Sequence, residues 1–258
     1  MAKVTDRYDN KNLINLAKQQ YTKKQSSKIP SELIKLPSSG VIYPMDSPLR
    51  QGLVEMRHMT AFDEDILTNF SYISEGVVFD KLLESLVITD TPILEISNVD
   101  REALIINARI LAYGDDYPVV VTHPTTKKQI NTSIKLSELK YKSMDLETDD
   151  NGDCTYVCED KSVIKFTYAP KPYDTKKGTN VISSFLISVI TEINESKDPN
   201  YIKEFLQYNF PFKESKKFQK HVTSNMPGLI KEVEVEGEDG GTFFAGFQIG
   251  SDLFWPKS

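Results

Sequence analysis

A helix without a polar face constrains this chain more than any other feature. Between residues 103 and 112, eight of ten side chains are apolar, and the other two are Asn107 and Arg109. A helix that is apolar on all sides is normally buried. We therefore predict a central helix over Arg101–Tyr113, with Asp100 as its N-cap and Gly114 as its C-terminal stop.

The arginine within this helix needs partners, because a buried guanidinium must be hydrogen-bonded. We predict that Arg109 forms an internal ion pair with Asp63 or Asp65. An anionic ligand is the alternative partner, but an acid on a neighbouring element requires no additional molecule.

The acidic cluster at residues 63–65 follows Thr60, which we predict to be the N-cap of a second helix. Asp63 stands three residues after Thr60, as in a capping box, and acids are favoured in the first turn by the helix dipole. A metal site or a general acid–base pair is the alternative. No Ser/His pair or glycine-rich phosphate loop lies nearby in the sequence. We favour capping, and predict no catalytic residue and no enzymatic activity.

The rest of the chain mixes helical and strand patterns. Proline and glycine interrupt residues 36–59, which argues for extended structure there. Apolar periodicity and turn residues define the other elements. They are a strand near 53–59, a helix from Thr60, a helix over 77–87, a hairpin over 118–136, strands near 155–157 and 163–168, helices over 181–193, from Pro199 and over 213–224, and a hairpin over 230–249. The predicted fold class is α+β, a helical body with two or more attached β-hairpins.

The charge is unevenly distributed along the chain. Residues 1–35 carry eight Lys or Arg and three acids, which leaves −11 on the remainder of a chain whose net charge is −6. We divide the chain into a basic, mobile arm (1–34), a core (35–145) and a second segment (146–258). The arm can be solvated or can contact a partner, and Lys18, Lys23 and Lys24 are its candidate binding residues. The acidic body argues against a duplex nucleic-acid binder.

Membrane insertion, secretion and metal binding find little support. No apolar run approaches the length that spans a bilayer, and the N-terminus lacks the apolar stretch of a secretory signal. Cys154 and Cys158 are too few for a disulfide framework, so we expect a reducing compartment. With His123 they would supply three ligands at a spacing that matches structural zinc poorly. We therefore predict no metal and no cofactor.

Several pieces of the chain resemble the T4-type bacteriophage baseplate protein family. They are Leu36-Pro-Ser-Ser-Gly40 with Tyr43-Pro44, Met59-Thr-Ala-Phe-Asp-Glu-Asp65, Asp100-Arg-Glu with Arg109-Ile and Tyr113-Gly114, and the closing Leu253-Phe-Trp-Pro256. The resemblance covers residues 30–145 well and the C-terminal third loosely. Its motifs are structural signatures, which identify a family without identifying a chemistry.

Members of that family often carry Cys-x-x-Cys pairs in the two hairpin turns, like zinc knuckles. This chain has His123-Pro-Thr-Thr126 and Glu238-Asp-Gly-Gly241 there instead. Because tetrahedral zinc needs four soft or imidazole ligands, the resemblance implies a degenerate, metal-free ribbon. Turn chemistry and strand pairing are then expected to hold the hairpins.

The resemblance implies a non-enzymatic role in assembling the central hub of a contractile-tail baseplate, as an assembly factor or chaperone that binds other hub proteins. Two alternatives stay open: a permanent hub component in the virion, and a degenerate zinc-ribbon protein that binds nucleic acid. The implied locations are the host cytoplasm during assembly and the virion baseplate, and homo-oligomers are compatible with either. Five aromatic residues near the C-terminus either close a core or form a docking patch for partners. They are Phe243, Phe244, Phe247, Phe254 and Trp255, and Phe254 and Trp255 are the candidate binding residues among them.

Overall fold

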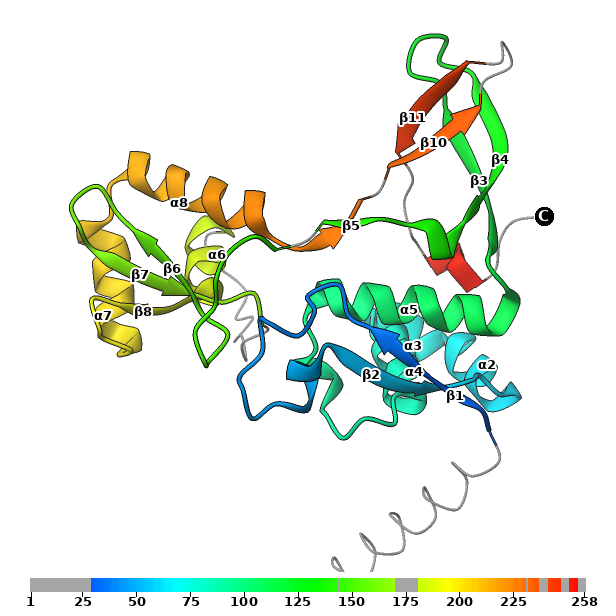
Figure 1. Cartoon of the computed structure of the whole chain (residues 1–258), viewed down its shortest axis with the longest axis horizontal. Helices are drawn as coiled ribbons and strands as arrows, with labels where there is room; N and C mark the ends of the chain where they lie inside the picture. Colours follow the sequence, from blue (N-terminus) through cyan, green and yellow to red (C-terminus); the bar gives the residue numbers. More distant parts are fainter. Residues whose placement is uncertain are drawn as a thin grey trace, which may run out of the picture.

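The computed structural model has three lobes: a central lobe that contains α5 (Asn98–Tyr113), a pair of hairpins above it, and an outer lobe at one end of the long axis (Figure 1). The residues that the structure describes are 29–142, 144–169, 181–230, 232–236, 241–246 and 251–254. Helices and small antiparallel sheets alternate along the chain, which confirms the predicted α+β class. The predicted basic arm, with Lys18, Lys23 and Lys24, lies outside the described residues. Within them, no helix is long and apolar enough to cross a membrane.

The central lobe is built on α5 (Asn98–Tyr113), as the sequence predicts. Its buried residues include Leu104, Ile106 and Ala108, and its C-cap is Gly114 at φ 86°. A two-stranded antiparallel sheet and short helices complete the lobe. These elements are β1 (Ser31–Lys35), η1 (Pro48–Gln51), β2 (Leu53–Arg57), α2 (Ala61–Leu67), α3 (Phe70–Glu75), α4 (Val78–Leu86) and η2 (Ile93–Glu95).

The outer lobe packs helices on a three-stranded antiparallel sheet of order β6-β7-β8. Aromatic rings fill its core, and Phe166 meets Phe218 edge-on at 5.4 Å between ring centroids. The last helix begins one residue before the predicted start and runs to Asn225. The elements are β6 (Cys154–Val157), β7 (Val163–Phe166), α6 (Val181–Val189), β8 (Ile190–Ile193), α7 (Pro199–Glu204), η4 (Phe205–Asn209) and α8 (Phe212–Asn225).

The predicted helix over 181–193 is wrong at its C-terminal end. Helix α6 stops at Val189, and the next four residues form β8, which pairs with β7 through Ile164 and Ile193. The β-branched residues Ile190 and Thr191 favour a strand. Ile190 and Ile193 are both buried. Pairing with a distant strand therefore overrides the helical spacing of the apolar residues.

The hairpin lobe joins two hairpins that are far apart in sequence. Strands β3 (Asp116–Thr122) and β4 (Gln129–Lys135) form one, and β10 (Glu232–Glu236) and β11 (Thr242–Gly246) form the other. Val121, Val235 and Ala245 form the small core between them. Figure 1 shows the two hairpins side by side above α5.

The turn of the first hairpin is closed by His123. Its Nδ1 accepts the backbone N–H groups of Thr125 and Thr126 at 3.2 and 3.1 Å, and its ring lies 4.5 Å from that of Phe243. The imidazole therefore supplies turn chemistry at the position where family members often place a zinc knuckle. Ring contact also links the turn to the second hairpin.

The chain crosses between lobes several times. Beyond η3 (Leu136–Glu138), β5 (Tyr141–Lys142) pairs with β9 (Gly228–Leu229), the segment that leads from α8 to the second hairpin. The last described element, η5 (Ser251–Phe254), returns to the core of the central lobe. Residues from both sides of the predicted boundary at 145 thus build the hairpin lobe and contribute to the central core.

A tight turn at Gly152 locks the start of the outer lobe onto the central lobe. Gly152 has φ 81°, and a Cβ added there would lie 2.3 Å from the carbonyl oxygen of Ile42. Nearby, the Met45 N–H donates to the Asp150 carbonyl, and the Thr148 hydroxyl donates to the Val41 carbonyl, both at 2.9 Å. A side chain at residue 152 would force the turn away from the backbone of Ile42.

We expect Gly152→Ala to lower the free energy of unfolding by about 2–4 kcal/mol, through left-handed strain and overpacking together. Gly76→Ala is the matched control. Gly76 has φ 72° with no atom within 4 Å of an added Cβ, so strain alone should cost about 1 kcal/mol there. Urea denaturation of both variants measures the difference. Equal losses would show that the contact with Ile42 does not constrain the lobes.

Candidate functional site

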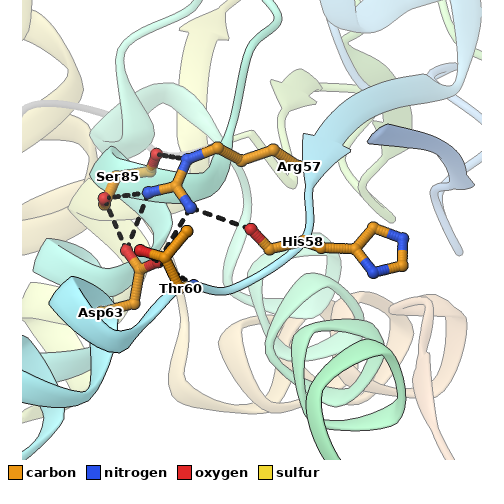
Figure 2. A network of polar contacts seen from close by, with 5 residues as sticks. All are labelled: Arg57, His58, Thr60, Asp63 and Ser85. Carbon is orange, nitrogen blue, oxygen red and sulfur yellow. Dashed lines mark hydrogen bonds and ion pairs between the residues drawn. The ribbon is translucent and has the colours of Figure 1, made fainter. Parts of the chain in front are cut away.

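The most charged buried site joins Arg57, at the end of β2, to Asp63, in the first turn of α2. The guanidinium Nη1 and Nη2 each donate to one Asp63 oxygen at 2.8 Å (Figure 2). Asp63 also accepts the N–H of Thr60 at 2.7 Å and hydrogen bonds from the Thr60 and Ser85 hydroxyls. Thr60 is the N-cap of α2, as predicted.

Every donor of this guanidinium has an acceptor. Besides its bonds to Asp63, Arg57 donates to the carbonyl oxygens of His58 and Ser85 and to the Ser85 hydroxyl, which accounts for all five N–H groups. Burial acts to raise the pKa of Asp63, but hydrogen bonds from Arg57, Thr60 and Ser85 outweigh it and hold the pKa below its usual value. The network is a closed structural joint between β2, α2 and α4.

The predicted ion pair between Arg109 and the acidic cluster is therefore wrong. Asp63 pairs with Arg57, and Asp65 is exposed on α2. Arg57 ends a strand only six residues before Asp63, so the pair forms locally across the turn into α2. The guanidinium of Arg109 instead binds backbone.

Arg109 attaches the C-terminal segment to α5. Its Nε donates to the Leu253 carbonyl at 3.0 Å, Nη1 donates to the Gly114 carbonyl at 2.9 Å, and the guanidinium carbon lies 4.9 Å from the centroid of the Tyr113 ring. Burial lowers the pKa of Arg109, although the nearby Tyr113 and Tyr117 act in the opposite direction. Carbonyl groups satisfy a buried cation here without a carboxylate.

A second buried network is centred on Asp100, which is not the N-cap that we predict. Helix α5 begins three residues earlier, and Ser97 is the N-cap, whose hydroxyl accepts the Asp100 N–H. The Asp100 carboxylate accepts hydrogen bonds from the Ser38 N–H and hydroxyl, the Tyr43 hydroxyl and the Ser97 hydroxyl, at 2.5 to 3.0 Å. The sequence Ser97-Asn-Val-Asp100 places an acid in the first turn, where the helix dipole stabilises it.

The Asp100 network holds the punctuated loop 36–44 against the start of α5. Asp100, Ser38, Tyr43 and Ser97 are all at most 3% exposed. The Tyr43 hydroxyl also accepts the N–H of Ser97 at 2.9 Å. Burial, and then the charge of Asp100, raise the pKa of Tyr43 far above its usual value, so this hydroxyl remains a donor. The residues form an anchor, closed to solvent.

Phe254, a candidate partner-binding residue, is buried. It is 1% exposed, and its ring lies 6.1 Å from Phe79 and 6.3 Å from Tyr113. Of our two hypotheses for the terminal aromatics, Phe254 thus follows the one in which they close a core. Trp255 lies outside the described residues.

The cysteines do not gather with other ligands. Cys154 and Cys158 are buried and free, and burial raises the pKa of each thiol to about 11. Among the described residues, no group of three or more His, Cys, Asp or Glu could hold a metal ion. The thiols are therefore protonated core residues at neutral pH.

Large apolar side chains are exposed on all three lobes, and of these only Phe244 belongs to the terminal aromatics considered above as a docking patch. Phe62, Phe70 and Ile73 lie on α2 and α3, and Val120 and Phe244 lie on the hairpins. Tyr208 lies in η4, and Phe212 is the first residue of α8. Helix α3 buries none of its residues. Within α3, Tyr72 is partly buried against the central core, whereas Phe70 and Ile73 are exposed.

Comparison with family models identifies the family of the chain. A family model described as T4 bacteriophage base plate protein matches residues 41–242, which is most of the chain. The chain belongs to this family. The match includes the Arg57–Asp63 joint, Asp100, the first hairpin and strand β10, and it ends at the first residue of β11. Searches of curated proteins and of solved structures find no significant match.

The resemblance inferred from the sequence motifs is thus confirmed, and the chain is a phage baseplate protein. Its partners are expected among other proteins of the baseplate. The buried charged residues Asp63, Asp100 and Arg109 of this baseplate protein bind other side chains or backbone groups.

Removing Arg57 should strand the buried Asp63 carboxylate. We expect Arg57→Ala to lower the free energy of unfolding of the baseplate protein by about 3–5 kcal/mol at pH 7. Lys81→Ala, which removes an exposed pair with Glu84, should leave it unchanged within error. Chemical denaturation measures both.

The loss in Arg57→Ala should depend on pH. The lowered pKa of Asp63 stabilises the fold above the unfolded value of about 3.9, and this stabilisation disappears as the pH falls through the folded pKa. The gap between wild type and Arg57→Ala should therefore narrow toward pH 3. A small gap that is constant with pH would contradict the assignment of Arg57 and Asp63 as a coupled pair.

Proposed function

We propose that this baseplate protein is a non-enzymatic assembly factor that builds the central hub by binding other hub proteins. One observation carries the proposal. Four charged groups are hydrogen-bonded within the protein, and these are Arg57, Asp63, Asp100 and Arg109. Large apolar side chains, in contrast, are exposed. A catalytic site would instead present reactive polar groups to a substrate.

The hairpin lobe is the contact surface that we favour for another hub protein. It projects from the body above α5 (Figure 1). Val120 and Phe244 are 61% and 68% exposed there. Exposed apolar side chains on a projecting element are typical of protein interfaces, where aromatic residues contribute much of the binding energy.

A permanent place in the virion is the second candidate function, favoured by the family description of a base plate protein. Nucleic-acid binding by the paired hairpins is disfavoured by their charge. Strand β10 presents the exposed Glu232, Glu234 and Glu236, and phosphate groups would be repelled by these carboxylates. The proposal therefore concerns protein partners.

Affinity capture of the tagged protein from infected cells tests the proposal. We expect other hub proteins in the captured material, and absence of this protein from purified tails by mass spectrometry. Stoichiometric recovery in tails would favour the permanent component. Capture of host replication or transcription factors without hub proteins would contradict both hypotheses.

Phe244→Ser tests the hairpin surface in the same assay. Truncation of an exposed aromatic anchor costs about 1–2 kcal/mol of binding, so capture of one hub protein should fall roughly tenfold, with unchanged thermal stability. Leu94→Ser is the matched control, because Leu94 is 70% exposed on the central lobe. Equal capture by Phe244→Ser and wild type would exclude this lobe as the contact.

A further inference from the structure

Two exposed patches carry opposite charge, and neither is used by the proposed function. The acidic patch consists of exposed residues on α2 and α3. They are Phe62, Glu64, Asp65, Phe70, Ile73 and Glu75. Residues 60–80 contain no Lys or Arg. Among the described residues, the cation that pairs with α2 is Arg57, and its partner there is the buried Asp63. The patch therefore combines apolar surface with uncompensated negative charge.

The basic patch lies on the solvent side of α8 and on the segment before it. Its residues are Tyr208, Phe212, Lys213, Lys216 and Lys220, all exposed. Lys216 Nζ lies 5.5 Å from the centroid of the Phe212 ring. Glu214, the acid of α8, is buried and accepts a hydrogen bond from Tyr156. Glu159 pairs with Lys217 and lies near Lys213, so Lys216 and Lys220 supply most of the charge of the patch.

The lysines form a defined surface because of helical spacing. Phe212, Lys216 and Lys220 are four residues apart and share one face of α8, while Phe218 and Val222 on the opposite face are buried in the outer lobe. The solvent side of α8 thus presents an aromatic ring at the helix start followed by a row of cations. Its chemistry complements that of the acidic patch.

The two patches cannot meet within one molecule. Figure 1 shows α8 at one end of the long axis and α2 toward the other. We infer that the occupant of the basic patch is the acidic patch of a second copy of this chain. Apolar groups bury one another in this contact, while carboxylates and ammonium groups set the register.

Such a contact is head-to-tail, because it joins different surfaces of the two copies. A head-to-tail contact leaves one patch free at each end of a dimer, so further copies add until a ring closes or a filament grows. The inference concerns self-association and holds whichever hub protein binds the hairpin lobe.

Sedimentation velocity of the purified full chain tests it. The wild-type mass should rise above the monomer value of 29.3 kDa with increasing concentration, and the association should weaken in high salt. The variant Phe212→Ser with Lys216→Ser removes the basic patch, and Phe70→Ser with Asp65→Ser removes the acidic patch. Each should weaken self-association at least about tenfold, while Leu94→Ser should not.

A mixture of the two variants gives the most specific result. Each variant retains the patch that the other lacks, so the mixture should form a pair that cannot grow beyond two copies. A wild type that is monomeric at every concentration would overturn the inference. So would a mixture that stays monomeric, or variants that associate like wild type. Retention of the melting temperature by both variants shows that the losses are not due to unfolding.

Discussion

The hydrogen bonds to the buried carboxylate of Asp100 are the interactions on which the rest of the structure depends. They join Ser38 and Tyr43, in a loop with little regular structure, to the first turn of α5. The same loop receives the Gly152 turn of the outer lobe. Because the donors to Asp100 are neutral, its charge is stabilised by hydrogen bonds and by the helix dipole. One anchored loop thus positions both the central helix and the neighbouring lobe.

Local features could be predicted from the sequence, whereas distant partners could not. The apolar run and Gly114 predict α5 and its end, since helical spacing and C-capping depend on neighbouring residues. The partner of Arg109 is the Leu253 carbonyl, 144 residues away, and backbone acceptors leave no residue-type signal. Asp is a common N-cap residue, which made Asp100 the predicted N-cap. The N-cap of α5 is instead Ser97, which also has a capping side chain and stands three residues earlier. The sequence prediction missed strand β8 for a similar reason, because its pairing partner β7 lies elsewhere in the chain.

The same division explains what could be predicted about function. Motifs placed the chain in a baseplate family, and the family match confirms this. Those motifs contain Asp63, Asp100 and Arg109, which the fold uses internally. The surfaces proposed for binding, on α2–α3, on α8 and on the hairpins, include apolar residues whose exposure depends on the tertiary structure. A sequence pattern assigns such residues to the core by default.

The central claim is that buried polar residues support the fold and exposed apolar surfaces bind partners, and Asp100→Asn tests it most directly. The amide presents a donor to hydroxyl and N–H groups that also donate, so we expect a loss of about 2–3 kcal/mol in unfolding free energy. The folded fraction should bind hub proteins with an unchanged Kd. A variant that unfolds like wild type but no longer binds hub proteins would contradict the account.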